Sequence, residues 1–236
     1  MRISFILTLC MLLCSTFLTG CAGKTVDVVQ PKQFKILADH MGKELIAHNI
    51  LDENGSYVAP AFSQAGDNYG QHLYKRLSPA FIFEDTAYGM NAPTFAGSIS
   101  PSDRAKVGEN GFVIKYLQRT VTVNMIALVD WDGDGTNDWL ISCLVEPHNG
   151  ARTRDYTIII PNPKNEGPLQ ARVIGVYECF GLACTLYMRE SAAPTPTGPE
   201  PNISDTVPGL KPVTLPPGSA VPADAKENQL QERNLD

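Results

Sequence analysis

The residues with the clearest chemical pattern are four acids in the segment 130–139. They stand at relative positions 1, 3, 5 and 9, as Asp130, Asp132, Asp134 and Asp138. Carboxylates this close repel one another unless a cation cancels their charge. Ca²⁺ does so because it takes six to eight oxygen ligands in flexible geometry. The spacing predicts a structural calcium site in which Gly135 makes the sharp turn and the carbonyl of Thr136 is a further ligand. Asp138 would bind directly or through water.

The pattern Asp-x-Asp-x-Asp-Gly-x-x-Asp resembles the calcium loops of FG-GAP, VCBS and thrombospondin type 3 repeats. It departs from a full EF-hand because position 12 is Ile141 rather than the bidentate Glu, and the residues that follow are typical of a strand. The resemblance covers about ten residues, so it implies a site and no overall family. The alternative is an acidic hairpin turn, since Asp-Gly alone favours hairpins.

A second resemblance lies at the N-terminus. Residues 3–18 form an apolar run that ends in Leu18-Thr19-Gly20-Cys21, which resembles a bacterial lipobox. The resemblance implies that residues 1–20 are a lipoprotein signal peptide and that Cys21 carries the acyl chains of a stable membrane anchor. Ala22 favours the periplasmic side of the outer membrane, by analogy with enteric sorting. The alternatives are an ordinary cleaved signal peptide and an uncleaved anchor.

The cysteine content agrees with export, and the net charge limits the class of partner. The chain has 25 acidic and 19 basic residues, a net charge of −6, which argues against nucleic acid as a partner. Outside the cytoplasm a disulfide is expected among Cys143, Cys179 and Cys184. Pairing of Cys179 with Cys184 across a turn is the first choice of three possible pairings. Cys143 would then be a buried free thiol on an apolar strand, with a catalytic thiol as the alternative.

The chain divides into four parts: the signal peptide, a lipidated tether at 21–30, a globular domain at 31–190 and a tail at 191–236. Apolar spacing predicts helices from Pro31 to His48 and over 67–77, and a short strand over 56–62. Alternation predicts an antiparallel meander of five strands over 121–129, 139–145, 156–160, 173–179 and 184–188. The fold class is therefore α+β, with N-terminal helices packed on a mostly antiparallel sheet. Half of the 18 prolines lie in the tail, which predicts disorder.

No sequence motif indicates an enzyme. His40, Glu44 and His48 share one helical stripe, where solvated polar residues and a metal site are the two interpretations. The leading hypothesis is a non-enzymatic, membrane-anchored envelope lipoprotein with a structural Ca²⁺ loop. It would serve assembly, adhesion or scaffolding by contacting a protein or cell-wall partner through its domain surface or Pro-rich tail. The alternative is an extracytoplasmic hydrolase with a site near Glu146 and His148, beside a long loop at 84–111.

Overall fold

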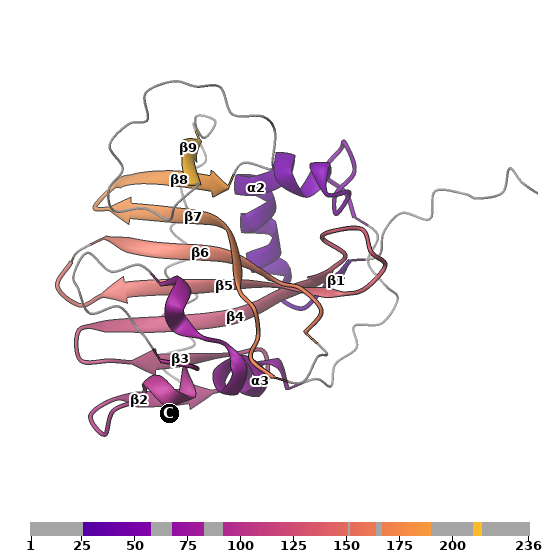
Figure 1. Ribbon diagram of the computed structural model, residues 1–236. Helices are drawn as coiled ribbons and strands as arrows, with labels where there is room; N and C mark the ends of the chain where they lie inside the picture. Colours follow the sequence, from indigo (N-terminus) through magenta and orange to yellow (C-terminus); the bar gives the residue numbers. More distant parts are fainter. Residues whose placement is uncertain are drawn as a thin grey trace, which may run out of the picture.

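The computed structural model describes residues 26–57, 68–82, 92–150, 152–163, 167–189 and 210–213. The predicted signal peptide, the predicted lipidation site Cys21 and most of the strand expected over 56–62 lie outside these residues. Within them, no helix is both long and apolar enough to cross a bilayer. The described chain is dominated by one antiparallel sheet (Figure 1).

The sheet is a meander in which β2 to β8 follow one another in space as they do in sequence. Residues 210–213 add a strand beside β8, and β1 pairs with the second half of β4. The strands are β1 Asp27–Val28, β2 Arg104–Val107, β3 Gly111–Lys115, β4 Arg119–Val129, β5 Asp138–Pro147, β6 Thr153–Ile160, β7 Arg172–Phe180, β8 Ala183–Arg189 and β9 Leu210–Val213. The helices are α2 Pro31–Ala47 and α3 Tyr69–Arg76, with short 3₁₀ turns η1 Pro79–Phe81 and η2 Ala96–Ser98.

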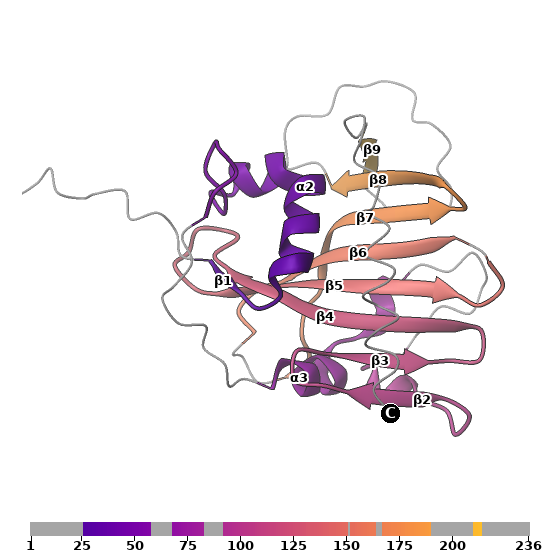
Figure 2. The same ribbon diagram turned by 180° about the vertical axis from the view of Figure 1, so that it is seen from behind.

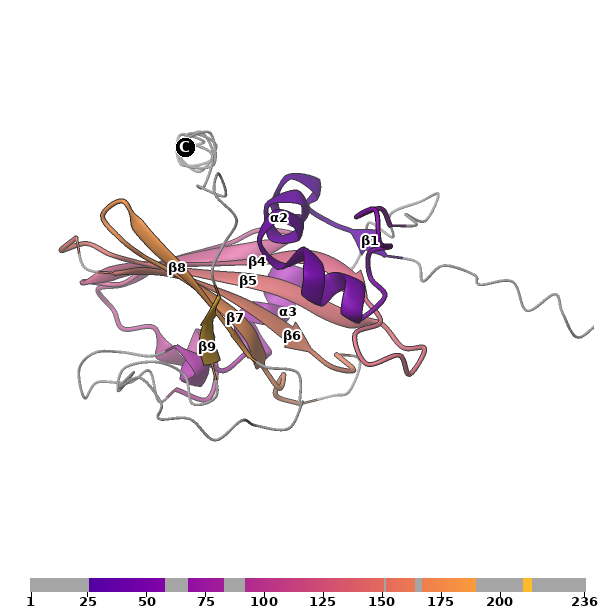
Figure 3. The same cartoon turned by 90° about the horizontal axis from the view of Figure 1, so that it is seen from above.

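The helices lie on opposite faces of the sheet, so the domain has three layers (Figure 3). Helix α2 packs Phe34, Leu37, Met41 and Leu45 on one face, which Figure 2 shows in front. Helix α3 and the two 3₁₀ turns cover the other face. The described residues thus hold two hydrophobic cores separated by the sheet.

A β-bulge in β4 moves the apolar residues of one strand from one core to the other. The register with β5 shifts between Met125 and Ala127. Met125 therefore contributes to the α3 core, whereas Ala127 and Val129 contribute to the α2 core. Strict alternation had placed all three on one face. A bulge adds one residue to a strand, so the side chains after it point to the opposite face of the sheet. One strand can therefore contribute to both cores.

The expected helices and all five expected strands are present, and the coarse α+β description holds. The expectation of about five strands on one helical layer was wrong, because β2 and β3 precede the predicted meander and the helices lie on both faces. Strand β2 lies within the segment 84–111, predicted as a long loop or irregular strands, and β3 begins at its last residue, Gly111. The predicted tether ends sooner, since Val26 is buried and residues 27–28 pair with β4. Within the predicted disordered tail, residues 210–213 form β9. These short strands lack periodicity and depend on the neighbouring strand for their hydrogen bonds.

The cysteines pair as the first choice predicted. Cys179 and Cys184 form a disulfide across the β7–β8 turn, and Cys143 is a buried free thiol. Burial raises the pKa of the Cys143 thiol well above its ordinary value, so the thiol is protonated and unreactive at neutral pH. The disulfide does not face a core, however, because Cys184 is exposed at the end of the sheet.

Candidate metal centre

The acidic loop joins β4 to β5 at the right-hand end of the sheet in Figure 1. Ligand oxygens of Asp130, Asp132 and Asp134 lie within 4.8 Å of one another. Asp130 is half-buried, and the other two are exposed. In the described part of the chain this is the one group of three or more acidic, His or Cys side chains with such spacing.

The three carboxylates also hold the loop in its curled form. Asp130 accepts hydrogen bonds from the backbone N–H of Gly133, at 2.7 Å, and of Gly135, at 3.3 Å. Both glycines have positive φ, +81° and +82°, which a side chain would strain. Asp132 Oδ1 likewise accepts from the Asp134 N–H at 3.1 Å. Each carboxylate has about four acceptor sites, so these bonds leave lone pairs for a cation.

Asp138 occupies a different position from the other three acids. It is 1% exposed and lies at the base of the loop, at the first residue of β5. Its Oδ2 accepts from the Trp131 N–H at 3.0 Å, and its Oδ1 accepts from the Asn162 N–H at 3.1 Å. Asp138 is not a member of the group of three converging acids. The observed geometry gives it a bracing role between the loop and the β6–β7 connection.

The pKa values of Asp134 and Asp138 shift in opposite directions because their surroundings differ. Hydrogen bonds from the side chain and backbone of Thr136 hold the pKa of Asp134 below its usual value. Burial raises the pKa of Asp138, although the N–H groups of Asn162 and Trp131 oppose this effect. Asp134 is therefore ionised at neutral pH, as a ligand of a hard cation must be.

The loop is tied to helix α2 through Trp131, which is 4% exposed. The ring of His48 stacks on Trp131 with centroids 3.9 Å apart. His48 Nδ1 lies 2.7 Å from the Trp131 carbonyl oxygen, and because a carbonyl only accepts, Nδ1 carries the hydrogen. His48 Nε2 lies 3.4 Å from Glu44. His40, Glu44 and His48 are thus not a group of converging ligand atoms in the described residues, and His48 packs on the loop instead of only facing solvent.

The structure therefore brings together three of the five predicted metal ligands. Thr136 stays close through its side chain, whose Oγ1 donates to Asp134 Oδ1 at 2.6 Å and lies 2.8 Å from Asn162 Oδ1. Sequence reasoning missed Asn162 and His48, which stabilise the loop from distant elements. Asn162 has φ +47°, and its place beside Pro161 and Pro163 marked it only as a turn residue.

The residues of the hydrolase alternative are only partly brought together. Asp155 and Glu146 lie on adjacent strands of the α2 face, and burial followed by the Glu146 charge raises the pKa of Asp155 to about 7. His148 Nε2 lies 3.0 Å from Thr120 Oγ1, and Thr120 is the cross-strand partner of Glu146. A surface hollow lined by Asn68, Gln71 and the β2–β3 turn lies at the other end of the sheet.

Comparisons of the chain with protein-family models, with curated proteins and with solved structures found no match.

Proposed function

We propose that this protein is a membrane-anchored lipoprotein of the cell envelope whose domain is stabilised by Ca²⁺ in the β4–β5 loop. Cys21 would carry the lipid, and the domain would serve assembly, adhesion or scaffolding without catalysis. The observation that carries the calcium part is the convergence of Asp130, Asp132 and Asp134 within 4.8 Å. The lipobox-like sequence carries the anchor.

The chemistry of the loop supports this choice of ion. The three side chains offer only carboxylate oxygens, which suit hard cations and not soft metals. The loop is short, glycine-bearing and partly exposed, so it can adjust to the variable geometry that Ca²⁺ accepts better than Mg²⁺ does. The loop joins the central strands β4 and β5 and touches α2 through Trp131. A bound ion would therefore stabilise one hairpin and its contact with the helix.

A calcium titration of the whole chain, stripped of metal with a chelator, tests this proposal. Trp131 lies inside the loop and Trp139 follows it, and both are buried at 4% and 7% exposure. Their emission and the melting temperature are the two measurements. We expect a saturable change and a higher melting temperature with Ca²⁺ and a much smaller effect with Mg²⁺. The affinity expected for an extracellular module without the bidentate Glu is roughly 10⁻⁴–10⁻³ M.

Two variants separate ion binding from general screening of charge. The double variant Asp132→Asn with Asp134→Asn keeps the side-chain shape and should abolish the calcium response. Asp52→Asn is the matched control, because Asp52 is an exposed acid that caps another turn through the N–H groups of Asn54 and Ser56. Equal calcium shifts in the parent and the loop double variant would refute the proposal and leave an acidic hairpin turn.

The anchor has a separate test. Mass spectrometry of the membrane-extracted protein should find diacylglycerol on Cys21, and Cys21→Ser should release the protein from the membrane fraction or leave its signal peptide uncleaved. A mature N-terminus elsewhere, without lipid, would refute the anchor but not the calcium site. A partner through the domain surface or the Pro-rich tail remains part of the proposal.

The hydrolase alternative is favoured by one observation, the pair formed by Asp155 and Glu146. A carboxyl that stays protonated near pH 7 beside a second carboxyl is a known arrangement for acid–base catalysis. Assays with a panel of ester, glycoside and peptide substrates test it. Any turnover should fall at least about a hundredfold in Glu146→Gln. Turnover unchanged in this variant would remove the pair from consideration.

A further inference from the structure

Exposed apolar side chains gather at one end of the sheet. The turns 116–118, 148–150 and 180–183 all lie at the left-hand end in Figure 1, and we call these three turns the hairpin end. Leu117 is 81% exposed, Phe180 63% and Leu182 104%. They are three of the four exposed large hydrophobic side chains in the described part of the chain. Single exposed apolar residues are ordinary, so the feature to be explained is the occurrence of three of them at one end of the sheet.

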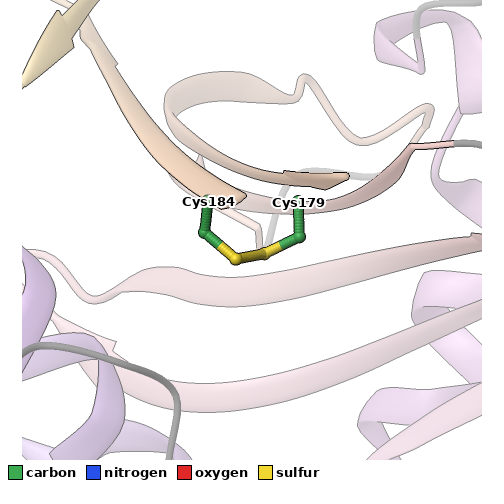
Figure 4. Close-up of a disulfide and its surroundings, with 2 residues drawn as sticks. All are labelled: Cys179 and Cys184. Carbon is green, nitrogen blue, oxygen red and sulfur yellow. A yellow bond between two sulfur atoms is a disulfide. The ribbon is translucent and has the colours of Figure 1, made fainter. Parts of the chain in front are cut away.

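The turn that carries two of these side chains is covalently closed at its base. The disulfide between Cys179 and Cys184 links the two strands directly before the tip (Figure 4). Phe180 pairs with Ala183, so only Gly181 and Leu182 form the turn itself, and Gly181 adopts φ +59°. Phe180 and Leu182 are therefore presented on a short, constrained protrusion, which limits the conformational entropy lost on binding.

The fully exposed charges at the hairpin end are cations, Arg104, Lys115 and Arg152. The acids beside them are less exposed, since Asp103 and Glu146 are half-buried and Glu178 is buried. Arg104 pairs with Lys115 in the β2–β3 ladder, which places both beside the Leu117 turn. Arg152 precedes β6 and contacts Glu178 on β7.

The opposite end of the sheet carries the acidic loop, and the whole chain has a net charge of −6. The cations at the hairpin end therefore stand out against an acidic protein. Exposed cations also occur at the acidic end, where Arg172 begins β7 and Arg189 ends β8. The hairpin end differs because its cations lie among exposed apolar tips.

We propose that the hairpin end docks onto an anionic lipid bilayer, with Phe180, Leu182 and Leu117 entering the interface and the cations meeting lipid headgroups. Membrane binding of peripheral proteins combines these two elements, buried apolar area and attraction to anionic lipid. The proposal stands apart from the lipid anchor, because β1, near the start of the described chain, pairs with β4 at the end far from these turns.

The arrangement of the tips favours a flat surface over a pocket in a protein. Leu117 and Leu182 are on turns separated by four strand-to-strand steps, which is on the order of 20 Å at about 4.8 Å per step. A pocket would receive one tip and leave the others in water. A bilayer interface can receive all of them at once, and it tolerates convex contacts because lipids rearrange around them.

Tryptophan quenching by spin-labelled lipid tests the contact. The full chain, held by its own N-terminus in vesicles of phosphatidylcholine with or without phosphatidylglycerol, would carry Leu182→Trp or, as a matched control, Glu109→Trp. Glu109 is also exposed on a hairpin turn, but at the opposite end of β3. Trp131 and Trp139 are buried and give the same background in both proteins. The spin-labelled lipid is placed either in the anchoring vesicles or in acceptor vesicles added afterwards.

Loss of emission from the Leu182→Trp variant with anionic lipid, without loss from Glu109→Trp, supports the proposal, and the labelled vesicle population identifies which bilayer is contacted. Replacing Arg104 and Lys115 with Gln should then weaken the contact by roughly fivefold for each cation. Quenching in neither arrangement, or equal quenching of both variants, overturns the proposal. A failed calcium titration would leave this result unaffected. Holding the chain in vesicles rests on the proposed lipid at Cys21, so co-sedimentation of the chain with the anchoring vesicles is checked first, and its failure counts against the anchor and not against the hairpin end.

Discussion

Substituting Asp155 by Asn should change how the stability of the domain depends on pH. Asp155 alternates with Tyr156 of the α3 core, so its side chain lies on the α2 face of β6. The residue is partly exposed, but its Oδ1 atom is enclosed and has no hydrogen-bond partner among the described residues. Burial, with a smaller contribution from the charge of Glu146, raises its pKa from 3.8 to about 7.

The sign and size of the effect follow from proton binding. Between about pH 4 and pH 7 the unfolded chain has released this proton and the folded chain still holds it, so stability falls as the pH rises through that range. Below about pH 4 both states are protonated, and the group has no effect. At 1.36 kcal/mol for each tenfold change in the acid constant, the loss by pH 8 is at most about 4 kcal/mol. Partial exposure of the residue will reduce this figure.

The assay is urea unfolding followed by tryptophan emission, in chelator, at several pH values from 4 to 8. The quantity compared is the difference in unfolding free energy between Asp155→Asn and the parent, because other titrating groups cancel in it. We expect this difference to move in favour of the variant by up to about 4 kcal/mol from pH 4 to pH 8. Glu146→Gln should reproduce only the smaller part of the change, since burial is the larger cause. A difference that is constant across the range would refute the reasoning.

Three further outcomes are expected. Gly70→Ala should destabilise the domain by about 1–3 kcal/mol, because a Cβ there would lie 2.1 Å from the carbonyl oxygen of Gly108. Gly42→Ala is the control, since a Cβ at Gly42 would meet open space, and it should be neutral or stabilising. Thermal unfolding of both variants measures the difference. Glu178→Ala should lower the free energy of unfolding by about 3–5 kcal/mol, because the buried Arg154 loses the carboxylate that lies 2.7 Å away. The double variant Glu178→Leu with Arg154→Met should recover most of that free energy, as measured by urea titration. Reduction of the disulfide at the hairpin end should lower the free energy of unfolding by about 2 kcal/mol, because the loop that it closes is short and lies outside both cores. The domain should stay folded, which circular dichroism would show.

The sequence was sufficient to predict the elements that depend only on their own residue patterns. Helix α2 and strands β4 to β8 follow from the spacing of their own apolar residues, which is why they were predicted from residue patterns. The β7–β8 disulfide was predicted because Cys179 and Cys184 bracket a turn containing Gly181. The convergence of three acids was also local, since alternate residues of one short loop cannot move far apart.

Only the tertiary structure decided the features that depend on distant residues. The bulge after Met125 assigns the two halves of β4 to different cores, and no pattern within β4 marks where the pleat reverses. Asp138 looked like a fourth ligand by its spacing, yet it lies outside the group of three converging acids and accepts hydrogen bonds from the backbone N–H groups of Trp131 and Asn162. The hairpin end exists because an antiparallel meander returns every second turn to the same edge, so residues more than sixty positions apart share one surface. Local residue propensity determines where each strand forms, whereas long-range pairing determines which residues the ends of the strands bring together.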